Sequence, residues 1–90
     1  MTEPRIRVSV RETPDGWVAD VMVSGDRKTS HRVMISRAEH DHFGGGGVAS
    51  LVLRSFEFLL EREPNTSVLR EFDLSVIERY FPEYAAAIRR

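Results

Sequence analysis

Three histidines and their acidic neighbours are the residues of this chain whose types best suit metal binding. His40, Asp41 and His42 are consecutive, Glu39 precedes them, and His31 lies earlier in the chain. Imidazole nitrogens and carboxylate oxygens bind zinc and harder ions. On a helix, however, adjacent residues point about 100° apart, and residues at i and i+2 do not face each other. The spacing therefore favours a polar, solvated helix, and we expect neither a metal ion nor another cofactor.

A glycine run is the second pattern that suggests chemistry, in this case phosphate binding. Gly44–Gly47, followed by Val48 and Ala49, matches the form G-x-G-x-x-A and opens a predicted helix. A dinucleotide site of that form needs a preceding strand and a βαβ unit. Here a polar helix is expected before the glycines, and no Gly-Lys-Ser/Thr follows as in a phosphate-binding loop. We therefore interpret residues 44–47 as a flexible joint.

Acid–base and nucleophilic catalysis have weaker candidates. Glu57 and Glu61 share a helix face at i and i+4, with Arg54 nearby, which is typical of a solvated face with a weak ion pair. Ser30 and His31 are neighbours on a predicted strand, so their side chains point to opposite faces. A nucleophile needs an oriented base beside it, and this pair does not provide one. We expect this protein not to be an enzyme.

The composition describes one ordinary globular domain over residues 1–90. Hydrophobic residues make up 41% and charged residues 30%, which argues against disorder. The 13 basic and 14 acidic residues leave a formal net charge of −1, whereas a dedicated nucleic-acid binder usually has a positive surplus. The absence of cysteine excludes disulfides and thiolate chemistry. No apolar stretch has membrane length and the first residues do not resemble a signal peptide, so we expect a cytoplasmic protein without membrane contact.

Residues 5–36 have the pattern of an antiparallel meander. Residues 5–11 alternate strictly between apolar and polar side chains, and Thr13-Pro14-Asp15-Gly16 has the composition of a tight turn. Two further strands are expected at residues 17–23 and 31–36, joined by a polar loop. The alternation predicts that one face of this sheet is apolar, with Ile6, Val8, Val10, Val33 and Ile35 on it.

Helices are expected in the remainder of the chain. Ser36 and Glu39 have the spacing of a capping box, which predicts a short helix at residues 37–43, and Gly44 is expected as its left-handed cap. A main helix is expected at residues 48–62, ended by Pro64. Its apolar stripe includes Phe56, which we expect between helix and sheet. Short helices are expected within residues 66–90: a turn at 67–71, a helix capped near Ser75, and a last helix from residue 82 to 88.

These elements predict an α+β fold: a three-stranded antiparallel meander covered on one face by the main helix and the short C-terminal helices.

Two stretches resemble known proteins. The phrases RSFEFLLEREP (residues 54–64) and LREFDLSVIERYFPEY (residues 69–84) resemble a recurring phrase in a group of small bacterial proteins that has no assigned activity. The stretch Asp15-Gly16-Trp17-Val18-Ala19 is similar to the start of a β-hairpin in HicB-type antitoxins. That second resemblance implies a hairpin, a third strand and a helix, and it is a likeness of fold only.

The solvent face of the predicted meander is the least ordinary feature of the sequence. It combines arginines with aliphatic side chains, namely Arg5, Arg7, Arg11 and Arg32 with Val18, Met22 and Met34. A mixed face of this kind suits binding to a protein partner or to a second copy of the chain. We therefore expect a non-catalytic interaction or self-association module. A small nucleic-acid-binding or antitoxin-like regulator that uses the arginines is the alternative.

Overall fold

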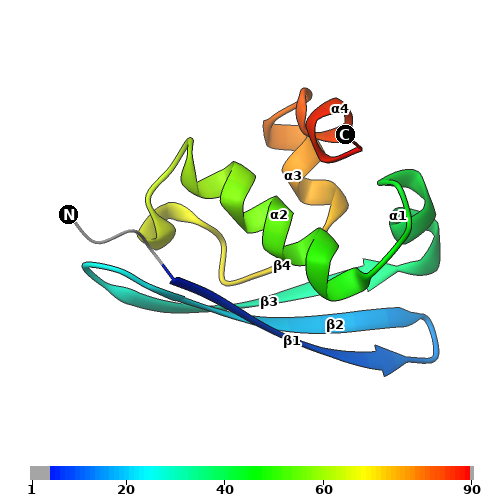
Figure 1. Ribbon diagram of the computed structural model, residues 1–90, viewed down its shortest axis with the longest axis horizontal. Helices are drawn as coiled ribbons and strands as arrows, with labels where there is room; N and C mark the ends of the chain where they lie inside the picture. The colour runs from blue at the N-terminus through cyan, green and yellow to red at the C-terminus, as the bar shows by residue number, and fades with distance from the viewer. Residues whose placement is uncertain (1–4, 90) are drawn as a thin grey trace.

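The protein forms two layers, a sheet with helices on one of its faces (Figure 1). The structure is a computed structural model that describes residues 5–89. All of the described helices lie above the same face of the sheet, and the opposite face has no layer over it. The predicted α+β class is confirmed.

The sheet contains the predicted meander and one further strand. β1 (Arg5–Thr13), β2 (Gly16–Ser24) and β3 (Lys28–Ser36) pair antiparallel in sequence order. β4 (Glu71–Asp73) then pairs parallel to β3, with Phe72 opposite Val33. The sheet therefore has four strands in the order β1-β2-β3-β4, and the prediction of three strands was wrong.

β4 also replaces part of a predicted helix. A helical turn was expected at residues 67–71, but a 3-10 turn occupies Asn65–Ser67 and the chain then extends into the sheet. The backbone N–H of Arg32 donates to the Arg70 carbonyl (2.7 Å) and that of Leu74 donates to the Met34 carbonyl (3.0 Å). Pairing with the otherwise open edge of β3 thus outweighs the weak local preference of a short segment for helix.

Four α-helices were found close to the predicted positions. They are α1 (Arg37–His42), α2 (Val48–Leu60), α3 (Ser75–Tyr80) and α4 (Tyr84–Ile88). α2 ends two residues before the predicted boundary, because the N–H groups of Arg62 and Glu63 both donate to the Leu59 carbonyl in a terminal turn that precedes Pro64. Pro82 lies before α4 rather than within its first turn.

The core lies between the sheet and α2. The alternation along the strands buries Val21, Val33 and Ile35, while Leu51 and Phe56 of α2 are at most 1% exposed. A second part of the core lies on the other side of α2, where the ring of Tyr84 packs against Phe43 and Phe58 at centroid distances of 5.0 and 5.3 Å. Aromatic side chains from α2, α4 and the end of α1 thus hold the C-terminal helices onto α2.

Candidate interaction surface

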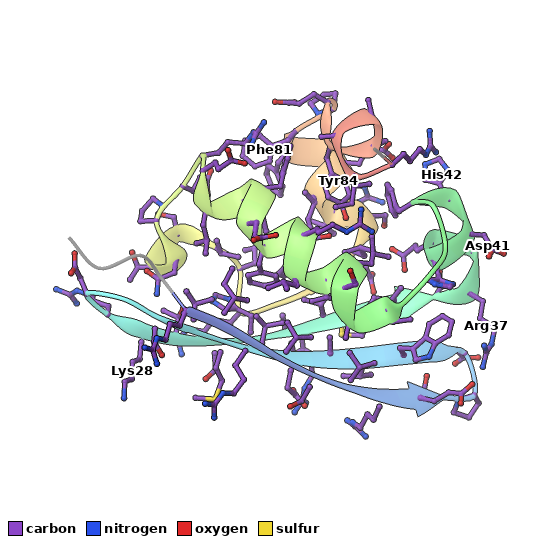
Figure 2. The ribbon with its side chains drawn as sticks, viewed as in Figure 1. Lys28, Arg37, Asp41, His42, Phe81 and Tyr84 are labelled. Atoms are coloured by element: carbon purple, nitrogen blue, oxygen red, sulfur yellow. The ribbon has the colours of Figure 1, made fainter. Side chains whose placement is uncertain are left out.

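The outer face of the sheet is the face that no helix covers, and Figure 2 shows side chains projecting from it away from the helices. Because side chains alternate along a strand, every second residue points to this face. Away from the β1–β2 turn, its members are Arg5, Arg7, Ser9 and Arg11 of β1, Val18, Asp20, Met22 and Ser24 of β2, Lys28, Ser30, Arg32 and Met34 of β3, and Glu71 and Asp73 of β4. We call this set the outer face. It includes all seven side chains that the sequence analysis selected.

The strand register arranges the outer face in rows that run across the sheet. One row contains Arg11, Val18, Met34 and Asp73, in the order of the strands. The next contains Ser9, Asp20, Arg32 and Glu71. A third contains Arg7, Met22 and Ser30. Side chains that are directly opposite on neighbouring strands are close enough to interact, so neighbouring side chains within a row can contact each other.

Charge on the outer face differs between its two edges. β1 contributes three arginines along one edge, at residues 5, 7 and 11, and β4 contributes Glu71 and Asp73 at the other. Between the edges, the Arg32 guanidinium binds the Asp20 carboxylate at 3.3 Å, with both side chains about half exposed. Arg32 is therefore not the free cation that the predicted basic patch required.

The prediction of this face from the sequence did not include its three acidic residues. Asp20 could have been found, because it lies between Val18 and Met22 in the same alternation. Glu71 and Asp73 could not, because their place on the sheet depends on β4, a strand of only three residues that pairs with a distant part of the chain. The outer face is thus mixed in charge rather than basic.

Apolar side chains occupy the middle of the outer face. Met22 is 49% exposed, and Val18 and Met34 are partly buried beside it. A shallow hollow of about 310 Å³ adjoins Met22 and is lined in part by Ser30 and Arg70. Arginine stems can cover aliphatic groups on a sheet surface, but they leave half of the Met22 side chain in contact with solvent. The two central strands therefore have apolar side chains on either side of the Asp20–Arg32 ion pair, together with a concave region.

The histidines, which were the metal candidates, lie apart and each has another partner. His31 is 3% exposed; its Nδ1 donates to the Leu69 carbonyl (2.8 Å), which leaves Nε2 to accept the Thr29 hydroxyl proton (2.8 Å). A carbonyl can only accept, so this arrangement places a proton on Nδ1. His31 thus joins β3 to the segment before β4.

His40 and His42 have structural contacts in the last turn of α1. The Nε2 of His40 donates to the Gly46 carbonyl (2.7 Å), and its ring packs on Trp17 at a centroid distance of 4.8 Å. His42 lies beside Glu78, at 3.7 Å. Within residues 5–89, no three metal-binding side chains come together. The arrangement gives these histidines roles in holding α1 and the glycine turn.

The glycine run has a defined backbone path. Gly44, Gly45 and Gly46 have φ of 106°, 67° and 78°, a region that other residues rarely adopt. The Gly45 N–H donates to the His40 carbonyl (2.8 Å), which caps α1, so the left-handed cap expected at this helix end is present. With His40 bound to Gly46 as well, the run forms a turn between α1 and α2.

Glu39 holds the most heavily hydrogen-bonded carboxylate of the described helices. Its Oε1 accepts the Ser36 N–H and its Oε2 accepts the Ser75 N–H, both at 2.8 Å. Burial alone raises the pKa of this carboxyl, but the backbone hydrogen bonds from Ser36 and Ser75 favour the charged form and hold its pKa below 4.5. This partly buried charge stabilises the termini of two helices.

A second apolar surface lies in the helical layer, at the end of α2. It is a groove of about 220 Å³ whose lining includes Leu59, Phe72 and Phe81. Leu69 and Tyr80 lie in the same lining and are 48% and 68% exposed. The groove is separate from the outer face, since α2 and α3 cover the opposite side of the sheet.

Over residues 5–89, the helices are all too short or too polar to span a bilayer. Comparisons of the chain with protein-family models, with curated proteins and with solved structures gave no match.

Proposed function

We propose that this protein is a non-catalytic interaction module that binds its partner through the outer face of the sheet. The observation that carries this proposal is the exposed Met22, which lies with Val18 and Met34 on the central strands, between two charged edges. Interfaces typically have an apolar core inside a polar rim, in which the core provides affinity and the rim charges provide orientation. The outer face has that layout over four strands.

The same face supports protein binding better than nucleic-acid binding. Affinity for a phosphate backbone comes mainly from basic side chains that displace counterions. Asp20 neutralises Arg32, and Glu71 and Asp73 would repel phosphates that approach the far edge. These carboxylates have no such cost for a protein partner, whose own basic groups can pair with them.

A nucleic-acid-binding or antitoxin-like regulator is the second candidate, and the arginine row of β1 favours it. Arg5, Arg7 and Arg11 are exposed along one strand at alternate positions. With a rise of about 3.3 Å per residue, the row is about 20 Å long, which is enough to contact several phosphates. In this case Arg7→Ala would weaken binding to all sequences alike and reduce its salt dependence.

Affinity capture with matched variants tests the proposed module. The wild-type chain and the two variants, Met22→Asp and Leu53→Asp, are each immobilised. Mass spectrometry then quantifies the proteins that each of the three retains. Leu53 is the control because it is a similarly exposed apolar residue (38%) on α2, in the helical layer. We expect a retained protein, including added copies of this chain, to be lost with Met22→Asp and kept with Leu53→Asp. Equal retention by both variants, or retention of nucleic acid alone, would contradict the proposal.

A further inference from the structure

The charge layout of the outer face points to its occupant, and this inference rests on the function proposed above. We propose that a second copy of the chain packs on the outer face, sheet against sheet, about a two-fold axis that runs along the strands.

The two edges of the outer face have opposite charge. The arginines at positions 5, 7 and 11 lie on β1, and Glu71 and Asp73 lie on β4 at the far edge, with Arg70 just before that strand. A two-fold interface brings the same surface patch of both copies together, so it must be complementary to itself. A face with one basic and one acidic edge meets that requirement only in certain orientations.

An axis along the strands is the orientation that matches the charges. Such a rotation places β1 of one copy over β4 of the other, and β2 over β3, because it reverses the order of the strands across the interface. An axis across the strands would instead place β1 over β1, arginines against arginines. Pairing through the free edge of β1 would also bring the two arginine rows together, and like charges that face each other are destabilising.

The row register makes the match specific to individual residues. Rotation about the strand direction leaves a residue's position along the strand unchanged, so each row faces the same row of the second copy in reverse order. Arg11 then lies over Asp73 of the second copy, and Val18 lies over Met34. In the next row, Asp20 lies over Arg32 of the second copy, and Arg32 lies over Asp20 of the second copy.

In the same orientation, Met22 of each copy meets a complementary part of the other copy's surface. Met22 of one copy lies over Ser30 of the other, because the two residues share a row on neighbouring strands. Ser30 lines the hollow of about 310 Å³, which provides space for the methionine side chain. Aligned sheets pack with their strands about 30° apart, which is compatible with contact along the central rows.

The size of the face indicates a reversible dimer. Nine-residue strands are about 30 Å long, and the width from β1 to β3 with the short β4 gives an interface of roughly 1,000 Å² for the two copies together. This area is at the low end of specific interfaces. We expect the chain to be monomeric at low concentration and dimeric at high concentration.

Sedimentation velocity over a concentration series up to about 1 mM tests the proposal with designed charge variants. Arg11→Asp and Asp73→Arg should each raise the dimer dissociation constant by roughly tenfold, because each change acts at two symmetric contacts. The double variant Arg11→Asp/Asp73→Arg should restore dimerisation. Within one copy these residues are three strands, about 14 Å, apart, so the rescue can come only from contact between copies.

Further variants separate the possible outcomes. Met22→Asp should prevent dimerisation and Leu53→Asp should leave it unchanged, with circular dichroism showing that each variant is folded. A wild-type chain that remains monomeric throughout the series, or a double variant weaker than both single ones, would overturn the second copy as the occupant. The proposed interaction module is tested independently, because capture of a different protein that is lost only with Met22→Asp would still support it.

Discussion

Oε2 of Glu39 accepts the backbone N–H of Ser75 at 2.8 Å, which connects α1 to the first residue of α3. The other oxygen of the same carboxylate accepts the Ser36 N–H and completes the capping box of α1. α3 has no side-chain cap of its own: its N-cap residue is Leu74, whereas a helix capped near Ser75 was expected. One carboxylate therefore stabilises two helix termini that are far apart in the sequence.

Glu39→Ala should lower the free energy of unfolding by about 2 kcal/mol, because two N–H groups lose a charged acceptor in a partly buried position. Urea unfolding followed by the fluorescence of Trp17, the single tryptophan, measures the change. Glu57→Ala is the matched control, since Glu57 is an exposed glutamate on α2. A loss for Glu39→Ala no larger than for this control would show that the bridge between α1 and α3 contributes nothing to stability.

The stability should also depend on pH through Glu39. Because the folded pKa of this carboxyl lies below its ordinary value of 4.5, the charged form is favoured by folding. The contribution is therefore complete above about pH 5 and is lost as the pH falls through the folded pKa. We expect the difference in unfolding free energy between wild type and Glu39→Gln to shrink as urea titrations move from pH 6 to more acidic conditions. A constant difference would contradict this assignment.

Tyr84 and Ser55 form the buried hydrogen bond that joins α4 to α2. The Ser55 hydroxyl donates to the Leu51 carbonyl (2.7 Å), so the Tyr84 hydroxyl donates to Ser55 Oγ (2.6 Å). Tyr84→Phe and Ser55→Ala should each lower the free energy of unfolding by about 1–2 kcal/mol. In a double-mutant cycle, the sum of the two single-variant losses in unfolding free energy should clearly exceed the loss in the double variant, because both substitutions remove the same bond. Simple additivity would exclude the bond.

Burial raises the pKa of Tyr84 from 10.0 to about 12. The neutral phenol is thus favoured by folding, and its contribution to stability should be lost as the pH rises from 10 towards 12. Tyrosinate absorbance in a Tyr80→Phe variant, which retains Tyr84 as its only tyrosine, measures the titration directly. Ionisation at the ordinary value in the folded protein would mean that the ring is accessible to water.

Phe56→Ala should lower the free energy of unfolding by about 3–5 kcal/mol, a large share of the stability of a small domain. The ring is 1% exposed and packs between the rings of His31 and Phe72, at 5.3 and 6.2 Å between centroids. Urea unfolding of this variant is compared with Leu53→Ala, which removes an exposed side chain from the same helix. A cost below about 1 kcal/mol would contradict the packing of α2 on the sheet.

Metal removal should leave the protein unchanged. His31 uses both ring nitrogens and His40 uses its Nε2 in hydrogen bonds with protein groups, and His42 lies beside Arg89 and Glu78. We expect EDTA and stoichiometric zinc to leave the melting temperature unaltered. A rise of several degrees with zinc that disappears in His42→Ala would show that a metal site forms after all.

Much of the local structure could be predicted because neighbouring residues determine it. The alternation from Arg5 to Arg11, the capping box of Ser36 and Glu39, and the glycine cap after α1 depend on contacts within a few residues. The burial of Val33, Ile35 and Phe56 followed from the period of each element, since a strand or helix must place its apolar side in the core. All seven side chains chosen for the outer face were placed correctly for the same reason.

Tertiary structure decided the features that require distant partners. The segment Glu71–Asp73 becomes a strand because β3 offers an unpaired edge, and no local pattern in three residues distinguishes that outcome from a helical turn. The same pairing brings Glu71 and Asp73 to the outer face and changes it from a basic patch into a face with two oppositely charged edges. Likewise, the bonds of Glu39 with Ser75 and of Tyr84 with Ser55 exist only after the helices have packed, because each joins residues whose separation along the chain leaves no local signal.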